Sequence, residues 1–145
     1  MKSTTRILCL AAIATLVAVV IALPASAGMG PSAKVSVKVT GSTAVATTTL
    51  SHFTIDAKDV GKAKSAGKGH LHFALDGGKY DYPKYSGANG QLAVKLGIAG
   101  KYSPAVTPTI TYKNLPSGKH TLTVFLVNND HSNTGAKAST QFVVK

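Results

Sequence analysis

The stretch Gly69-His70-Leu71-His72-Phe73-Ala74-Leu75-Asp76-Gly77-Gly78 decides how the rest of the chain folds. Between residues 70 and 75, leucine and phenylalanine alternate with histidine and alanine. A period of two is typical of a β-strand, and it puts the apolar side chains on one face and the imidazoles on the other. The Asp76-Gly77-Gly78 segment then predicts a turn, because glycine adopts positive φ angles without steric cost. We therefore expect a core strand that also displays two histidines.

The first 27 residues have the features of a secretory signal peptide. Lys2 and Arg6 form a basic start, residues 7–23 are apolar and uncharged, and Ala25-Ser26-Ala27 is a typical cleavage site. We expect a secreted or periplasmic domain that spans residues 28–145. An uncleaved membrane anchor is the alternative, because about 17 apolar residues is close to the lower limit for a membrane span.

The composition after residue 27 indicates one lysine-rich domain without cysteine. These residues, about 118 in number, are enough for a single hydrophobic core. The only cysteine, Cys9, lies in the signal segment, so the domain can form neither a disulfide nor a blue-copper site, which needs a thiolate. The full chain carries a formal net charge of +11, and the domain has 14 lysines, no arginine and 5 aspartates as its only acidic residues. The lack of arginine and the expected secretion argue against nucleic-acid binding.

The pattern of apolar residues and turns predicts an immunoglobulin-like fold. About seven short strands, with no long helix, are typical of an all-β, antiparallel two-sheet sandwich. One segment is ambiguous: residues 86–100 read as a strand or as a short helix near 89–96, and helix-forming residues favour the helix. The clearest expected strands cover residues 35–39, 47–56, 69–75, 106–112, 120–127 and 138–144.

Two loops are candidate partner-binding surfaces. Residues 58–68 form a polar loop with four lysines, among them Lys62, Lys64 and Lys68, which would attract an anionic partner or would simply be solvated. Tyr80, Tyr82 and Tyr85 cluster in a second loop, where tyrosines suit recognition or cover the edge of a core.

The topology of such a sandwich predicts a histidine cluster at one end. The third and sixth strands of an immunoglobulin-like domain are antiparallel neighbours, so the start of one lies beside the end of the other. His70 and His72 begin the third strand, and Asp130 and His131 follow the sixth. Neutral imidazole is a ligand for copper and zinc, and Asp130 would be a further ligand or would orient one. The alternative is that these histidines only tie loop backbone together through hydrogen bonds.

His120, unlike the histidines of the predicted cluster, is expected to be structural. The segment NLPSGKHTLTV resembles the turn that enters the sixth strand of immunoglobulin-like domains, and His120 stands where such domains often carry a tyrosine corner. His120 lies at the end of the sandwich opposite to the proposed cluster. With Asp76 and Gly77 in the turn after the third strand, it forms the set of residues that we expect to support the fold.

The motifs GHLHFALDGG, PSGKHTLTVFL and NNDHS together resemble a family of uncharacterised secreted bacterial domains. The resemblance covers about half of the domain, adds Gly118 to the expected structural residues, and implies an immunoglobulin-like sandwich outside the cytoplasm without an established activity. Its motif positions are His70, Leu71, His72, Phe73, Asp76, Gly77, Gly118, His120, Asn129, Asp130 and His131. A fainter similarity links the His-x-His strand to copper-dependent superoxide dismutases, but their bridging histidine pattern, disulfide and active-site arginine are missing here.

These observations favour a non-catalytic binding module that holds copper or zinc through His70, His72, His131 and Asp130. The main alternative is a structural or surface-interaction domain that contacts an anionic envelope polymer or a protein. A copper-dependent enzyme similar to superoxide dismutase is the third possibility. No serine–histidine–acid triad and no phosphate-binding loop is evident in the sequence.

Overall fold

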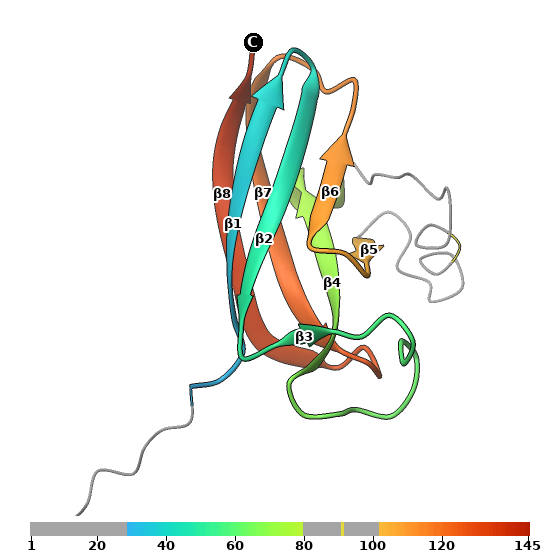
Figure 1. Cartoon of the computed structure of the whole chain (residues 1–145). Coiled ribbons are helices and arrows are strands. Elements are labelled where there is room, and N and C mark those ends of the chain that lie inside the picture. Colours follow the sequence, from blue (N-terminus) through green and yellow to red (C-terminus); the bar gives the residue numbers. More distant parts are fainter. Residues whose placement is uncertain (1–28, 80–90, 92–101) are drawn as a thin grey trace, which may run out of the picture.

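Two β-sheets pack face to face in the computed structural model, which describes residues 29–79, 91 and 102–145 (Figure 1). The first sheet has three strands in the order β1-β2-β6, and the second is built on the order β3-β4-β7-β8, with β5 also paired to β4. The strands of the first sheet are β1 (Ser32–Thr40), β2 (Thr43–Ser51) and β6 (Thr109–Tyr112). Those of the second are β3 (Thr54–Ile55), β4 (Lys68–Leu75), β5 (Ser103–Ala105), β7 (Gly118–Asn128) and β8 (Asn133–Val144). A short 3-10 turn, η1 (Asp76–Gly78), follows β4.

This topology confirms the predicted immunoglobulin-like all-β sandwich. The β1-β2-β6 and β4-β7-β8 orders correspond to the A-B-E and C-F-G strands of immunoglobulin domains. One pairing departs from the antiparallel expectation, because β3 runs parallel to β4 and makes the second sheet mixed.

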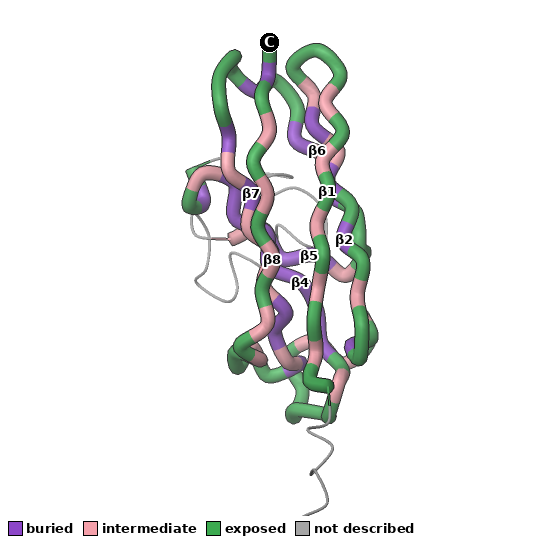
Figure 2. The backbone as a smooth tube through the Cα atoms, turned by 90° about the vertical axis from the view of Figure 1, so that its left-hand side faces the viewer, coloured by how far each residue is buried: buried purple, intermediate pink, exposed green. Residues whose placement is uncertain are grey.

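The core lies between the sheets and is made by one face of each central strand. Leu71, Phe73 and Leu75 of β4 point inward, as their alternation predicts, and each is fully buried. Figure 2 shows buried residues concentrated in β4, β6 and β7, while β1 and β8 alternate between half-buried and exposed positions. Such alternation is typical of strands with one face on the core and one in water. On β7, the fully buried apolar side chains of the core are Leu122, Val124 and Leu126.

Two predicted strands have different bounds in the structure. The expected strand 47–56 begins earlier, ends at Ser51 and continues as β3 in the other sheet. The break falls at the exposed His52, whose φ of 56° is left-handed and turns the chain out of the ladder. The expected strand 106–112 is shorter, because β6 covers only Thr109–Tyr112. The separate three-residue β5 lies just before the expected strand and contains Pro104, whose missing amide hydrogen is tolerated there.

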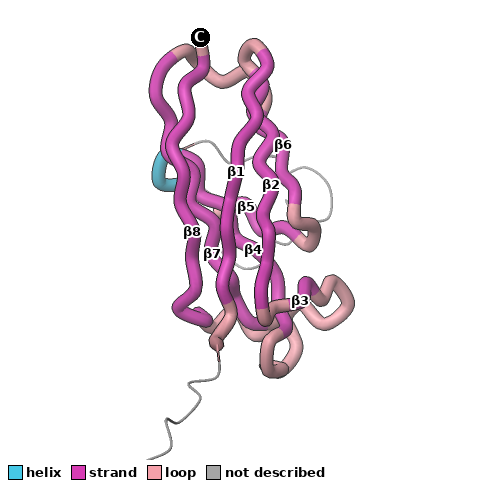
Figure 3. The backbone as a smooth tube through the Cα atoms, turned by 60° about the vertical axis from the view of Figure 1, so that its left-hand side comes forward, coloured by secondary structure: helices cyan, strands magenta, loops and turns pink. Residues whose placement is uncertain are grey.

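The antiparallel pairing of β4 with β7 positions the residues of interest. Its register runs from Gly69 opposite Asn128 to Leu75 opposite Leu122, so the start of β4 lies beside the end of β7. The long strands β1, β2, β7 and β8 run along the length of the sandwich, and the β1–β2 and β7–β8 turns lie at its opposite ends (Figure 3). The start of β4 and the β7–β8 turn therefore meet at one end, as the sequence predicts.

Three predictions fall on residues outside those that the structure describes. They are the signal segment 1–27, the helix near 89–96 apart from residue 91, and the tyrosine loop with Tyr80, Tyr82 and Tyr85. Among the described residues, no helix has the length and apolar character required to span a membrane.

Gly69 allows the start of β4 to approach β7 closely. A Cβ atom at this position would lie 1.9 Å from the Val127 carbonyl oxygen and 2.9 Å from Cζ of Phe53. Real Cβ atoms do not make such contacts with backbone, so only glycine fits here without moving a strand. The pairing that places His70 opposite Val127 therefore depends on the glycine at position 69.

We predict that Gly69→Ala destabilises the fold by about 3 kcal/mol or more, because the methyl group overlaps a backbone carbonyl that cannot rotate away. Urea unfolding followed by circular dichroism measures the change. Gly30→Ala is the matched control, since a Cβ at residue 30 meets no atom within 4 Å. Equal stability of the two variants would contradict the steric argument.

Candidate metal centre

Strand β4 places two imidazoles side by side on the outer face of the second sheet. His70 and His72 are two residues apart, so both point away from the face that carries Leu71 and Phe73. Both residues are nevertheless buried, because His70 is not exposed to solvent and His72 is only 6% exposed. On β7, Val127 lies opposite His70 and Phe125 lies opposite His72.

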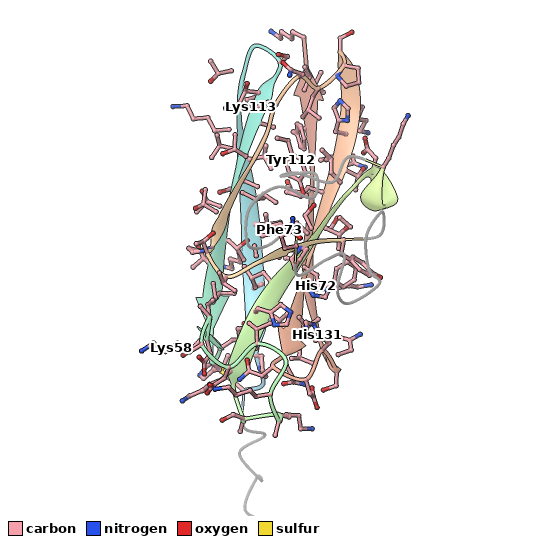
Figure 4. The ribbon with its side chains drawn as sticks, turned by 90° about the vertical axis from the view of Figure 1, so that its right-hand side faces the viewer. Lys58, His72, Phe73, Tyr112, Lys113 and His131 are labelled. Atoms are coloured by element: carbon pink, nitrogen blue, oxygen red, sulfur yellow. The ribbon has the colours of Figure 1, made fainter. Side chains whose placement is uncertain are left out.

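The third imidazole comes from the turn between β7 and β8. His131 adopts a left-handed φ of 64°, and its backbone N–H donates a hydrogen bond to the Asn128 carbonyl at 3.0 Å. The Asn128 N–H donates to the Ser132 carbonyl at 2.9 Å, and the Asn128 amide group donates to the hydroxyl of Ser132 at 2.9 Å. These bonds define the path of the turn, and Figure 4 shows the His131 side chain beside that of His72.

The three imidazoles converge to within ligand distance of one another. Nε2 of His70 lies 3.0 Å from Nε2 of His72, and each of the three residues offers a ring nitrogen within 4.8 Å of the others. Two nitrogens that bind one tetrahedral ion at 2.0–2.1 Å are separated by about 3.3 Å, so His70 and His72 are already near that spacing. The centroid of the His131 ring lies 4.5 Å from that of His70 and 5.7 Å from that of His72. The predicted convergence is confirmed, and the cluster has the composition of a metal site.

Burial keeps these imidazoles neutral. It lowers the pKa of His70 to about 3, with the neighbouring His72 and His131 adding to the effect. The pKa of His72 falls to about 4, again mainly through burial and then through His131. Burial also lowers the pKa of His131, although the charge of Asp130 opposes it. Neutral imidazole is the form that binds a metal ion, so protons compete little for this site at neutral pH.

Several nitrogen atoms of the cluster lack a partner among the described residues. Nδ1 of His70 and both ring nitrogens of His131 are buried there without a hydrogen bond. The close contact between His70 and His72 satisfies one nitrogen of each, since one Nε2 donates its proton to the other. Buried polar atoms without partners cost free energy, so an ion that accepts these lone pairs would stabilise the fold.

An aromatic wall lines the outer side of the cluster. The Tyr102 ring stacks on His72, with centroids 5.4 Å apart, and meets Phe125 edge-on at 5.5 Å. The sequence prediction did not include Tyr102, although it precedes the β5 residues that pair with His72 and Phe73. Beside the cluster is a pocket of about 230 Å³, which is lined by His72, Tyr102, Phe125, Val127, His131 and Asn133.

Asp130 is not part of the converging group of donors. Its Oδ1 accepts hydrogen bonds from the hydroxyl of Ser132 at 2.6 Å and from the Ser132 backbone N–H at 3.0 Å. The side chain is exposed, and these bonds hold its pKa below the usual range of a carboxyl group. Asp130 therefore shapes the turn that carries His131, and the group within ligand distance consists of the three histidines alone among the described residues.

His120 is held as a structural residue at the other end of β7. Its Nε2 donates to the Pro116 carbonyl at 3.0 Å, and its Nδ1 donates to Oδ2 of Asp76 at 2.7 Å. The other carboxylate oxygen of Asp76 accepts the backbone N–H of Thr121 at 2.8 Å. The bond to the upstream carbonyl reproduces the contact of a tyrosine corner, with an imidazole in place of the phenol.

The turns around this pair need left-handed backbone. Gly77 has φ of 70° and Gly118 has φ of 133°, which are conformations that favour glycine. Asp76 itself has φ of 49°, the less usual case of an aspartate in this region. The angles at Asp76 and Gly77 turn the chain after β4, and the Asp76 carboxylate reaches His120 and Thr121 of β7.

The pKa of His120 moves in the opposite direction from those of the cluster. Burial lowers it, but the hydrogen bond to Pro116 and the hydrogen bond and charge of Asp76 together outweigh burial and raise the pKa above its ordinary value. Both ring nitrogens face acceptors, which is an arrangement that the doubly protonated ring satisfies.

The lysine loop, residues 58–68, lies against the turn that carries His131. The Gly61 N–H donates to the Asn129 carbonyl at 2.7 Å. Lys62 forms an ion pair with Asp59 at 2.6 Å, and Lys64 and Lys68 are exposed. Whether these lysines bind a partner remains a prediction from the sequence.

Comparison with known proteins yields no match to the chain among family models, curated proteins or solved structures. The resemblance to secreted bacterial domains therefore remains a prediction that rests on the motifs.

We predict that the buried histidines of the metal-free protein separate into two groups in an NMR titration. The C2 protons of His70 and His72 should not titrate between about pH 5 and pH 8, because burial keeps both rings neutral. That of His120 should titrate above the ordinary histidine pKa. Cluster histidines that titrate near pH 6.5 would show that the site is hydrated in solution.

We predict that Asp76→Asn destabilises the protein by about 1–3 kcal/mol at low pH, because the protonated His120 loses its anionic acceptor. A raised folded pKa stabilises the protein fully below the unfolded value of about 6.5, and the contribution disappears as pH rises through the folded pKa.

In urea unfolding, Asp76→Asn should therefore lower the free energy of unfolding more at pH 5.5 than at pH 9. Asp59→Asn is the control, because its partner Lys62 is exposed and the ion pair adds little stability. An effect of Asp76→Asn that grows with pH would contradict this assignment.

Proposed function

We propose that this protein is an extracytoplasmic, non-catalytic binding module that holds one copper or zinc ion with His70, His72 and His131. The observation that carries the proposal is the convergence of three neutral imidazoles, two of them on one strand and the third on the adjoining turn. Structural histidines usually find hydrogen-bond partners in the protein, whereas Nδ1 of His70 and both ring nitrogens of His131 have none among the described residues.

The donor chemistry supports copper or zinc over other ions. Imidazole suits zinc and copper, whereas calcium and magnesium prefer oxygen ligands. The group holds neither a carboxylate nor a thiolate among the described residues. A two-residue spacing on a strand also fixes the relative position of His70 and His72 before any ion arrives, because both side chains stand on the same face of a paired strand.

The location and the lack of catalysis rest on the sequence. The first 27 residues have the pattern of a signal peptide, and no catalytic triad or phosphate-binding motif is evident.

Calorimetric titration of the metal-free protein with zinc, and separately with copper(II), tests the proposal. We expect a single equivalent to bind, and we expect His72→Ala and His131→Ala each to weaken binding by about 100-fold, because each removes one donor nitrogen. His52→Ala is the matched control: His52 is exposed and lies outside the cluster.

Circular dichroism of each variant separates loss of a ligand from loss of the fold. His131→Ala is the most informative change, since His131 lies in a turn and outside the sheet ladder. Equal metal affinity of His131→Ala and His52→Ala, with both variants folded, would contradict the proposed site.

A further inference from the structure

We infer that an ion held by the three histidines has one coordination position directed at the pocket beside His72, and that this position takes a small anion. The inference rests on the proposed metal site and adds a ligand class to it. It follows from the number of donors, the position of the pocket and the charge of the site.

The number of donors leaves a coordination position vacant. Zinc is nearly always four-coordinate, and sites with three protein ligands complete their coordination with water or an exogenous ligand. Copper(II) likewise takes at least four ligands in tetragonal geometry. All five histidines of the sequence lie in the described part of the chain, and only three of them converge. Between residues 80 and 101 the sequence contains no cysteine, no histidine and one carboxylate, that of Asp81.

The pocket identifies the side on which the vacant position lies. His72 and His131 both line the pocket of about 230 Å³, whereas His70 is fully buried behind them and does not. Protein atoms therefore enclose the cluster on the His70 side, and the pocket adjoins it on the side of His72 and His131. A ligand that enters the pocket therefore approaches an ion held by the cluster from the side of His72 and His131.

The charge of the site favours an anion. Three neutral imidazoles leave both positive charges of a divalent ion uncompensated, and the cluster is buried beside apolar side chains. An uncompensated charge in such surroundings is costly, and a coordinated anion reduces that cost. Asp130, the nearest carboxylate in sequence, is instead held by Ser132. The lysine loop, which is hydrogen-bonded to the same turn, adds positive charge at this end of the sandwich.

The walls of the pocket restrict the anion to a small and weakly hydrated one. Tyr102, Phe125 and Val127 present mainly apolar surface, and the amide of Asn133 is the main polar side chain apart from the histidines. Strongly hydrated anions such as phosphate need several hydrogen-bond donors to replace their water. A linear or planar anion with one coordinating atom needs none beyond the ion itself.

Azide added to the copper(II)-loaded protein tests this inference, with copper affinity measured first in its absence. We expect a new azide-to-copper charge-transfer band that saturates with one azide per copper, and an altered electron paramagnetic resonance spectrum. Phe125→Trp, which narrows the pocket, should weaken azide binding by about tenfold or more while copper affinity stays nearly unchanged.

Thr121→Leu is the matched control, because Thr121 shares the outer face of β7 but lies in a neighbouring depression with Ala74 and Gly77. Its azide affinity should equal that of the unchanged protein. Failure of both copper and zinc to bind would remove the proposed function and this inference with it. Normal copper binding with no azide band would overturn the inference alone, as would an azide band that appears only in Asp81→Ala, since Asp81 would then fill the fourth position. Equal weakening by Phe125→Trp and Thr121→Leu would also overturn it.

Discussion

The pairing of β4 with β7 is the constraint on which both the fold and the candidate site depend. One face of this pair carries the leucines and phenylalanine that fill the core, and the other carries two imidazoles. Because side chains alternate strictly along a strand, a shift of one residue would put the histidines in the core and the apolar side chains outside. The burial of the core face therefore fixes the position of the histidines, and Gly69 lets the two strands approach closely enough for that register to form.

Two histidine environments in one small sandwich show how surroundings decide the charge of the same side chain. His70 faces other rings and apolar surface, so desolvation dominates and the ring stays neutral. His120 is also buried, but it faces a carboxylate and a carbonyl, and these acceptors favour the protonated ring. The difference between a neutral candidate ligand and a structural histidine that favours the protonated form thus comes from the acceptors nearby, since both rings are buried.

Much of the arrangement could be predicted from the sequence because it follows from short-range patterns. Alternation between residues 70 and 75 predicts the strand and its two faces, and the antiparallel neighbourhood of the third and sixth strands predicts that His131 comes near them. The break at His52 could not be predicted, because the residues around it form one continuous β-rich run and the left-handed angle is a tertiary effect. The placement of Tyr102 depends on the β4–β5 pairing, and that of Asp130 on a competing hydrogen bond to Ser132. Neither long-range pairing nor competition between nearby partners leaves a clear signal in a single sequence.

The left-handed backbone conformation of His131 affects the stability of the turn between β7 and β8. Residues with a Cβ atom adopt that conformation at a cost of about 1–2 kcal/mol, and glycine would fit the same turn with less strain. A histidine with two unbonded nitrogens among the described residues is therefore a poor choice on grounds of folding alone. The turn thus carries a residue that lowers its intrinsic stability and that places a ring nitrogen within ligand distance of His70 and His72.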